Sequence, residues 1–475
     1  MPPEWTILLP YAILAAGGFF IWCAGLVVAR GSALLFWAAV AAAAVSGLSA
    51  TILAPPAALS FQDMIDAGGY ARYFLAIICA ITLLTLFFSY RYTRDRGIYG
   101  DEYYGLVVFA ALGMALAASG LNWIVFFLGI EMLSISLYVL IGSPKWEAPA
   151  NEAAVKYFVM GSVASGFLVF GIAVLFAATG SLDIGQSLGP AISPSNLPGA
   201  LLGLGLILAG IGFKASIAPF HLWTPDVYQG APAPVTAFLS TGSKVAILAA
   251  LLRFALNASD GLWGYFAPAL WVLAALTMTA GNITALVQTH IKRLLAYSSI
   301  AQMGYVLMTF LAVKQAGAEA IVFYLTAYAL MDLGAFGTVA LLSGPQSDRD
   351  SIADYAGAGY AHPWGGALLA VSLLSLAGLP PAAGFIGKVL LFKATIQAGY
   401  TGLAVLGILT AIVSVFFYIN VIVTLYMRPE NPAAPARRPD PAGTAAGAVV
   451  LLLIVLAGVF PSGLLGVIEG ILHSF

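Results

Sequence analysis

The stretch KASIAPFHLWTPDVYQGAPAPVTAFLSTGSK, residues 214–244, begins and ends with a lysine and contains four prolines. Long apolar runs lie on both sides of it, each close to the roughly 20 residues that cross a bilayer. Proline removes a backbone hydrogen-bond donor and clashes with the preceding turn, so a helix that enters this stretch is predicted to be interrupted. Because a charge in the hydrocarbon core costs roughly 2.5 to 3.5 kcal/mol on insertion scales, lysines at such a break indicate ion or proton transfer.

The composition of the whole chain indicates a membrane protein. Of the 475 residues, 61% are hydrophobic and only 8% are charged, and the mean hydropathy is +0.98. These values leave too few polar groups to cover a soluble protein of this length. The net charge of −1 provides no basic face, so a nucleic-acid partner is not expected. Both cysteines, Cys23 and Cys79, lie in apolar runs, so neither a disulfide framework nor a cysteine metal site is expected.

The apolar runs predict an all-α polytopic membrane protein with about fourteen transmembrane helices, of which the seventh and the twelfth are broken. We place the helices near residues 5–28, 33–54, 71–90, 103–119, 121–142, 152–179, 199–218, 234–256, 263–286, 294–313, 317–342, 363–398, 401–427 and 444–460. The seventh break lies near Pro219, and the twelfth lies near Pro380 in SLLSLAGLPPAAGFIGKVLLF, residues 372–392. Paired interruptions in two halves of a transporter indicate an ion site in the middle of the membrane.

The positions of the two breaks also predict an internal repeat. Helices four to eight and helices nine to thirteen each contain a break in their fourth member, and because five is odd, consecutive copies run in opposite directions. Lys214 and Lys388 would then occupy corresponding places in the two inverted repeats. The predicted divisions are a three-helix segment, a first repeat, a second inverted repeat, and a loop with the last helix, at residues 1–100, 101–258, 259–428 and 429–475.

Lysine and arginine are more frequent in the loops that follow odd-numbered helices than in the other loops. The loop region with Arg91, Arg94 and Arg96 is one of these. The positive-inside rule therefore predicts that this set of loops is cytoplasmic. With an even number of helices, both termini are expected on the periplasmic side.

Isolated charges inside the predicted helices are the candidate site residues. Glu131 stands alone among apolar neighbours in FFLGIEMLSISLYVL, residues 126–140, and the strongest lysines are Lys214, Lys244 and Lys388. A structural ion pair is the simple alternative for Glu131, but the recurrence of isolated charges favours a functional role. Glu152 and Lys156 are spaced to pair on one helix face, and either an interfacial salt bridge or a functional role would explain them.

Four stretches together resemble the antiporter-like subunits of NADH:quinone oxidoreductase, respiratory complex I, and the related multisubunit cation/proton antiporters. They are FFLGIEMLSISLYVL, the run GFKASIAPFHLWTPDVYQGAPAPVTAFLSTGSK, the stretch HIKRLLAYSSIAQMGY, and the break GLPPAAGFIGK. The resemblance extends over helices four to thirteen. Within the family, the sequence TPDVYQGAPAPVTAFLS and the chain length favour the bacterial subunit N branch.

The resemblance implies a system of proton half-channels. In it, Glu131 and Lys214 form a charge pair, Lys244 sits at the centre, and Lys388 leads to the opposite side. Burial disfavours the charged form of a lysine and a nearby carboxylate favours it, so lysine can act as a switchable proton carrier. Arginine cannot, because it does not lose its proton in proteins.

Four further residues are weaker candidates. His221 and His290 could extend a relay, since neutral imidazole both donates and accepts hydrogen bonds, although a lone histidine is more often simply packed. Lys292 lies near a predicted cytoplasmic helix end, where anchoring to lipid headgroups is the commoner role. Asp332, in YALMDLGAF, is an acid inside the membrane that faces either the polar axis or a neighbouring subunit.

The sequence has no glycine-rich dinucleotide fingerprint, P-loop or metal-ligand cluster, so no cofactor is expected in this chain. The resemblance implies that partner subunits hold NADH, FMN, iron–sulfur clusters and quinone. The other expected partners are membrane-arm subunits, including neighbouring antiporter-like ones, together with protons and the lipid of a bacterial inner membrane.

The predicted function is proton translocation driven by quinone reduction elsewhere in the complex. Two alternatives stay open. A subunit of a multisubunit monovalent cation/proton antiporter would show activity that depends on sodium gradients and needs no quinone. A structural module with inactive charges would tolerate neutral substitutions of the lysines.

Overall fold

The computed structural model describes residues 4–28, 31–52, 60–98, 101–189, 192–345, 347–430 and 440–473, which are almost entirely helical. The longer helices are α1 (Leu9–Gly25), α2 (Ala33–Ile52), α3 (Gly69–Asp95), α4 (Asp101–Ser119), α5 (Trp123–Ile141), α6 (Ala148–Thr179), α8 (Leu197–Lys214), α11 (Lys244–Asn257), α12 (Asp260–Ala285), α13 (Ile291–Phe310), α14 (Ala318–Leu342), α16 (Pro363–Ala377), α17 (Ala383–Gln397), α18 (Thr401–Met427), α19 (Pro441–Val459) and α20 (Pro461–His473).

The shorter elements connect or interrupt these helices. They are η1 (Glu4–Leu8), α7 (Ile184–Leu188), α9 (Trp223–Gly230), α10 (Ala233–Phe238), η2 (Leu239–Ser243), η3 (Val313–Gly317), η4 (Ile352–Tyr355) and α15 (Ala358–Ala361). Two strands, β1 (Ser60–Phe61) and β2 (Ile65–Asp66), pair antiparallel in a small hairpin before α3.

Within the described residues, twelve helices are long and apolar enough to cross a membrane. The predicted tenth helix coincides with α13, whose 20 residues include several polar ones, and the predicted twelfth is divided into α16 and α17, with 15 residues each. The all-α polytopic fold is confirmed, while the number of fourteen crossings stays a prediction. The C-terminal division is described only in part, because residues 431–439 of its loop lie outside the described residues.

Both predicted helix breaks are confirmed. The first separates α8, which ends at Lys214, from α9, and the second separates α16 from α17. The predicted correspondence of the two lysines stays a prediction: Lys214 precedes its break, whereas Lys388 follows its own and lies inside α17. A third irregularity was not predicted. The helix expected over 234–256 contains a wider, π-helical turn, η2, directly before Lys244.

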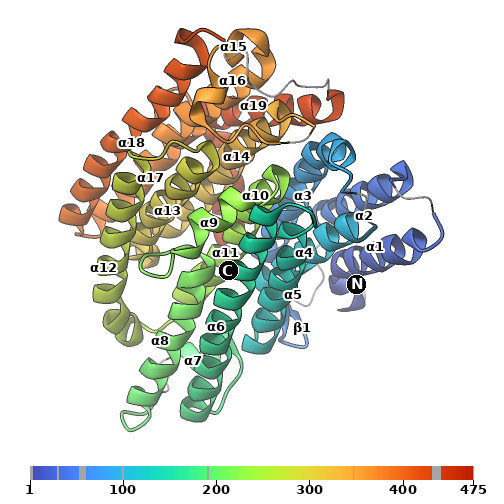
Figure 1. Cartoon of the computed structure of the whole chain (residues 1–475). Helices are drawn as coiled ribbons and strands as arrows, with labels where there is room; N and C mark the ends of the chain where they lie inside the picture. Colours follow the sequence, from blue (N-terminus) through green and yellow to red (C-terminus); the bar gives the residue numbers. More distant parts are fainter. Residues whose placement is uncertain are drawn as a thin grey trace.

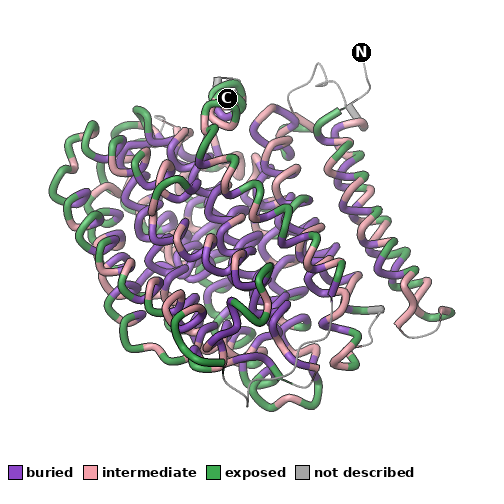
Figure 2. Tube along the Cα trace, turned by 90° about the horizontal axis from the view of Figure 1, so that it is seen from above, coloured by how far each residue is buried: buried purple, intermediate pink, exposed green. Residues whose placement is uncertain are grey.

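The bundle is broad, with α1 and α2 at one edge and α12 and α18 at the opposite edge (Figure 1). Buried residues fill the interior and exposed residues follow the perimeter (Figure 2). In the membrane span formed by α10, η2 and α11, every residue from Ala233 to Ala255 is buried, and nearly every residue of α13 and α14 is buried as well. Protein therefore surrounds the polar side chains of these helices, which removes the cost of exposing them to lipid.

Candidate functional site

Lys214 and Glu131 lie in the same region but are not directly paired. The Lys214 side chain is buried, and its Nζ donates a hydrogen bond to Oγ of Ser134 at 2.6 Å. Ser134 lies one helical turn after Glu131 on α5, and Glu131 accepts a hydrogen bond from Ser165 of α6. No ion pair joins Glu131 and Lys214 at contact distance among the described residues, and their predicted charge pair stays a prediction. A serine hydroxyl both donates and accepts hydrogen bonds, so Ser134 gives Lys214 a neutral partner on α5, the helix that also carries Glu131.

Aromatic rings surround the Lys214 ammonium. The ring centroids of Tyr138, Tyr157 and Phe213 each lie 5.8 Å from Nζ. Trp223, from the first turn of α9, stacks on Tyr157 with 4.6 Å between centroids and donates a hydrogen bond from Nε1 to the Phe213 carbonyl at 2.9 Å. The segment after the break thus caps the end of α8. Ring faces attract cations, so this setting favours the charged lysine where burial alone disfavours it.

Lys244 forms the centre of a hydroxyl cluster. Its side chain is fully buried, and Nζ donates a hydrogen bond to Ser299 of α13. The Ser299 hydroxyl lies 2.5 Å from the hydroxyl of Tyr328 on α14. The Tyr328 hydroxyl also lies 3.1 Å from Oδ2 of Asp332 and 3.0 Å from the carbonyl oxygen of Ser240 in η2. Because Tyr328 has only one hydroxyl proton, it can donate to one of these acceptors at a time.

Asp332 therefore belongs to the Lys244 cluster. The sequence left open whether this acid faces the polar axis or a neighbouring subunit, and the structure places it wholly buried on the polar axis. Its second oxygen, Oδ1, has no hydrogen-bond partner among the described residues. The ammonium of Lys244 and the carboxyl of Asp332 are thus linked through two hydroxyl groups.

Lys388 contacts the carbonyl groups that the second break exposes. Its Nζ donates hydrogen bonds to the carbonyl oxygens of Leu376 at 2.7 Å and Ala377 at 3.2 Å, at the end of α16. A cation at a helix C-terminus interacts favourably with the helix dipole. Gly378 follows with a φ of 82°, and a Cβ there would come within 2.8 Å of Cδ of Lys388. Only glycine combines this left-handed backbone with such a close lysine.

Polar residues of α13 connect the surroundings of Lys244 with those of Lys388. Ser298, the neighbour of Ser299, is hydrogen-bonded to the hydroxyl of Tyr418 on α18. Gln302, one turn further on, lies within 3.2 Å of that hydroxyl and donates to the Leu376 carbonyl at 3.1 Å. The Leu376 carbonyl also accepts from Lys388. We call the set Lys244, Ser299, Ser298, Tyr418, Gln302 and Lys388 the lysine chain.

The serines, Gln302, Tyr328 and Tyr418 were missed as site residues. For Ser298, Ser299 and Gln302 the signal in the sequence is the polar run SSIAQ, residues 298–302, inside an otherwise apolar helix, and the two tyrosines have no such signal. That run is part of the stretch HIKRLLAYSSIAQMGY, which also contains His290 and Lys292.

The two histidines are not joined to the lysine chain. His221 lies between α8 and α9, and His290 immediately precedes α13, where it pairs with Ser351 in an isolated β-bridge. The Nδ1 atoms of both are buried without a hydrogen-bond partner among the described residues. Their relay roles stay predictions.

Lys292 is part of a buried ion cluster, so the expectation of a headgroup anchor is wrong. Its Nζ lies 2.8 Å from Oδ2 of Asp348 and 3.2 Å from the carbonyl oxygen of Ala231. Arg96 also pairs with Asp348, at 2.7 Å, and Tyr92 donates a hydrogen bond to it at 2.9 Å. Burial alone would raise the pKa of Asp348, but Lys292 and Arg96 outweigh it and hold the pKa below its usual value. The cluster ties together the ends of α3 and α13 and the loop after α14.

The predicted pair of Glu152 and Lys156 is confirmed, with 2.7 Å between Oε1 and Nζ. Lys156 also pairs with Asp226 at 2.9 Å, and Arg293 reaches the other oxygen of Asp226 at 2.7 Å. These side chains are partly exposed, with 42% exposure for Lys156 and 67% for Glu152. The exposure favours the interfacial salt bridge over a role in the buried site.

The described residues contain no group of three or more His, Cys, Asp or Glu side chains that could hold a metal ion. The chemistry that this site offers is proton transfer between lysine, hydroxyl and carboxyl groups.

A family model described as NADH:quinone oxidoreductase/Mrp antiporter, TM, matches residues 120–414. NADH-quinone oxidoreductase subunit N 1 of Solidesulfovibrio magneticus is 48% identical over 468 residues, which cover 97% of this chain and 97% of that protein. A chain in the structure of respiratory complex I from Thermus thermophilus with bound aureothin is 34% identical, with a TM-score of 0.81, covering 96% of this chain and 98% of that one.

A chain of the Mrp complex from Dietzia sp. has a TM-score of 0.83, with 98% of this chain and 96% of that one covered. Its identity is only 20%, so this likeness concerns the fold alone. The much higher identity to the subunit N relative distinguishes the two branches of the family. The chain belongs to the family of NADH-quinone oxidoreductase subunit N, within the NADH:quinone oxidoreductase/Mrp antiporter proteins.

Proposed function

We propose that the chain is a proton-translocating membrane-arm subunit of NADH:quinone oxidoreductase, driven by quinone reduction elsewhere in the complex. The observation that carries the proposal is the placement of Lys214, Lys244 and Lys388, each 4% exposed or less, at interruptions of membrane helices. Isolated buried lysines are costly in a membrane and serve mainly in ion pathways. The subunit N and complex I relatives supply the identity of the complex.

The Lys244 cluster is built for proton transfer along hydroxyl groups. A proton leaves Nζ of Lys244 for Oγ of Ser299 while the Ser299 proton moves to the oxygen of Tyr328. The Tyr328 proton then moves to Oδ2 of Asp332, 3.1 Å away. The net result is one neutral amine and one neutral carboxyl, and each hydroxyl ends with one proton, as it began. The reverse sequence restores the charged pair.

The hydrogen-bonded connection from the surroundings of Lys244 to Lys388 differs from the connection to Asp332, because it includes a backbone carbonyl. The Leu376 carbonyl accepts hydrogen bonds from both Gln302 and Lys388, so it holds the two side chains in place without carrying a proton itself. Gln302 does not titrate either. These groups therefore position Lys388, and Ser298 and Tyr418 provide the exchangeable hydroxyl protons on the side of Lys244.

At the first break, Lys214 donates a hydrogen bond to Ser134 and Ser165 donates one to Glu131, so each charge has a serine partner. A change in the distance of Glu131 from the lysine would change how strongly the charged amine is favoured. We propose that this electrostatic link sets when Lys214 binds or releases a proton. It requires no direct contact between the two charges.

We further propose that other subunits hold NADH, FMN, the iron–sulfur clusters and quinone, and that neighbouring antiporter-like subunits flank this chain in a bacterial inner membrane. Both termini are proposed to be periplasmic. The division into segments 1–100, 101–258, 259–428 and 429–475, with the two repeats inverted, also stays a proposal.

A cation/proton antiporter subunit is the second candidate, because the matching family model covers both groups and the Mrp chain shares the fold. The two functions differ in their requirements. Transport that needs a sodium gradient and is unaffected by quinone reduction would favour the antiporter.

Lys214→Arg tests the proposed function. Arginine keeps the positive charge and the ability to donate to Ser134, but it does not release a proton in proteins. We expect normal assembly of the complex with clearly reduced quinone-coupled proton pumping in membrane vesicles. Lys145→Arg, at an exposed loop lysine, is the matched control and should pump normally. Wild-type pumping by Lys214→Arg would exclude this lysine as a proton carrier.

A further inference from the structure

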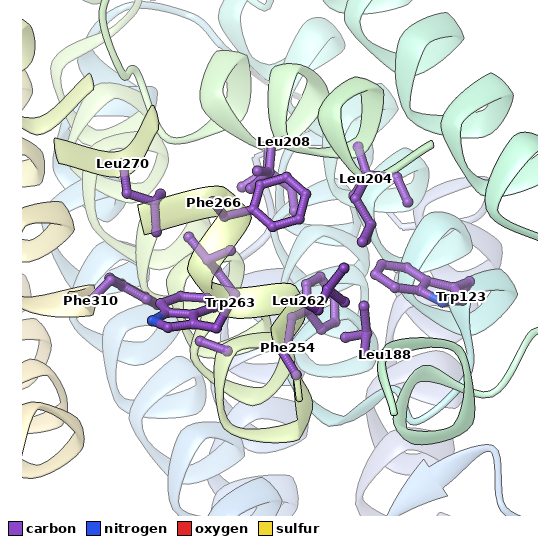
Figure 3. A pocket seen from close by; sticks show the side chains of 15 residues that line it. Trp123, Leu188, Leu204, Leu208, Phe254, Leu262, Trp263, Phe266, Leu270 and Phe310 are labelled. Atoms are coloured by element: carbon purple, nitrogen blue, oxygen red, sulfur yellow. The ribbon is translucent and has the colours of Figure 1, made fainter. Parts of the chain in front are cut away.

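An apolar cavity lies between α8, α11 and α12, and none of the residues of the lysine chain lines it (Figure 3). It has about 500 Å³ of empty space, counting the part that is open to the surroundings. All of its lining side chains are aliphatic or aromatic, among them Leu204, Leu208, Phe254, Phe266 and Phe310. A cavity with this lining does not hold water well, because water would find no hydrogen-bond partners there.

The cavity opens toward the hydrocarbon region of the membrane. Leu208 on α8 and Trp263 and Phe266 on α12 are partly exposed, whereas Leu204 and Phe310 behind them are buried. Both helices are long and apolar enough to span a membrane, so a lipid tail can reach the partly exposed side chains at the gap between them. A hydrocarbon chain is the occupant that this lining fits, since it loses no hydrogen bonds on entry.

A lysine lies at one end of the cavity. Nζ of Lys314 donates hydrogen bonds to the carbonyl oxygens of Ala258 at 2.6 Å and Leu256 at 3.1 Å, and Ala258 lines the cavity. Phe310, another lining residue, is the last residue of α13 and comes four residues before Lys314. Lys314 is exposed and forms no ion pair with a carboxylate among the described residues. The positive charge of Lys314 is therefore accessible from outside the protein, next to the apolar cavity.

We propose that this cavity binds one acyl chain of an anionic phospholipid, with the lipid phosphate at Lys314. The apolar cavity and the adjacent cation match the two parts of such a lipid. The cavity extends to Ile211, one helical turn before Lys214, so the bound chain fills apolar space next to the first proton carrier. This lipid site is independent of the identity of the transported ion.

The test uses the intact complex in nanodiscs that contain phosphatidylglycerol with a photoreactive diazirine near the end of one acyl chain. After illumination, peptides are analysed by mass spectrometry. We expect labelling of α8 and α12 residues that line the cavity. Leu208→Trp should abolish that labelling by filling the opening. Leu202→Trp is the matched control on the same helix, since Leu202 is 58% exposed and does not line the cavity.

The headgroup contact is tested separately with Lys314→Gln, which can still donate to the two carbonyl groups but has no charge. One lysine near anionic lipid is worth about a fivefold change in binding, so labelling should fall about fivefold. Lys393→Gln, at another exposed lysine, should leave it unchanged. Absence of labelling at the lining in the wild type, or equal labelling in Leu208→Trp, would overturn the proposal. Equal labelling by a phosphatidylcholine probe, unaffected by Lys314→Gln, would overturn the assignment of an anionic lipid.

Discussion

Tyr328→Phe removes the one hydroxyl that joins Ser299 to Asp332. In the wild type this hydroxyl lies 2.5 Å from Ser299 and 3.1 Å from Oδ2 of Asp332. The Phe variant keeps the ring and its packing but interrupts the only hydrogen-bonded link described between Lys244 and the acid. Positioned proton transfer typically contributes a factor of about 100 or more, so quinone-coupled proton pumping should fall by about a hundredfold.

The same change also carries a stability cost, which must be separated from the effect on pumping. Oδ1 of Asp332 already has no described partner, and the variant removes a donor from Oδ2. Leaving a buried acceptor less satisfied costs about 1–3 kcal/mol. Tyr70→Phe is a matched control, because Tyr70 is equally buried and donates to the Ala249 carbonyl at 2.7 Å, away from the lysine chain.

The assay compares proton uptake in inverted membrane vesicles with the rate of NADH oxidation, after the amount of assembled complex has been determined. Both variants should assemble, and only Tyr328→Phe should lose pumping. If Tyr328→Phe pumped at the wild-type rate, protons would not pass through this hydroxyl. Equal losses in the two variants would attribute the effect to stability and refute the relay as well.

Further predictions concern charges and backbone elsewhere in the fold. Asp348→Asn leaves Lys292 and Arg96 with only their more distant carboxylates, Asp350 at 3.6 Å and Glu147 at 3.7 Å. It should destabilise the subunit by about 1.5–3 kcal/mol, measured by thermal unfolding of the purified complex. Because the pKa of Asp348 is lowered in the folded state, its contribution should be constant above about pH 5 and lost as the pH falls below about 4, so the difference between variant and wild type should shrink there. Gly378→Ala should strain the left-handed backbone by about 1–2 kcal/mol and displace Lys388, lowering pumping in an assembled complex; normal pumping would contradict this. Glu152→Gln should change neither pumping nor thermal stability, since Lys156 keeps Asp226, and a loss of pumping would return this pair to the list of site residues.

The features that depend on local chemistry could be predicted from the sequence. The breaks near Pro219 and Pro380 follow from the geometry of the proline ring, which acts within one helical turn. The burial of Lys214, Lys244 and Lys388 follows from the cost of exposing a charge to lipid, which favours enclosing lysines of membrane helices within protein. The i, i+4 pair of Glu152 and Lys156 is local too.

The features that depend on contacts between residues far apart in the sequence could not be predicted from the sequence. Lys292 and Asp348 are 56 positions apart, and Ser298 and Tyr418 are 120 apart, so no spacing rule connects them. The absence of direct contact between Glu131 and Lys214 depends on side-chain positions to within a few ångström. Asp332 shows both kinds of feature. Its partner Tyr328 lies four residues earlier on the same helix, α14, and is local, whereas the contact between Tyr328 and Ser299 depends on how α13 and α14 meet.

The π-helical turn η2 has a consequence for the angular position of Lys244. Such a turn contains one residue more than an α-helical turn, so it rotates everything after it by about 100° relative to a regular helix. The extra residue also leaves the Ser240 carbonyl able to accept from Tyr328. A deletion of one residue from Leu239–Ser243 would give a more regular helix by the usual propensity rules, yet it would turn the Lys244 ammonium away from Ser299. The π-helical turn thus sets the direction in which Lys244 points. A fully regular α-helix would be more favourable by itself but would direct the lysine away from its proton-transfer partner.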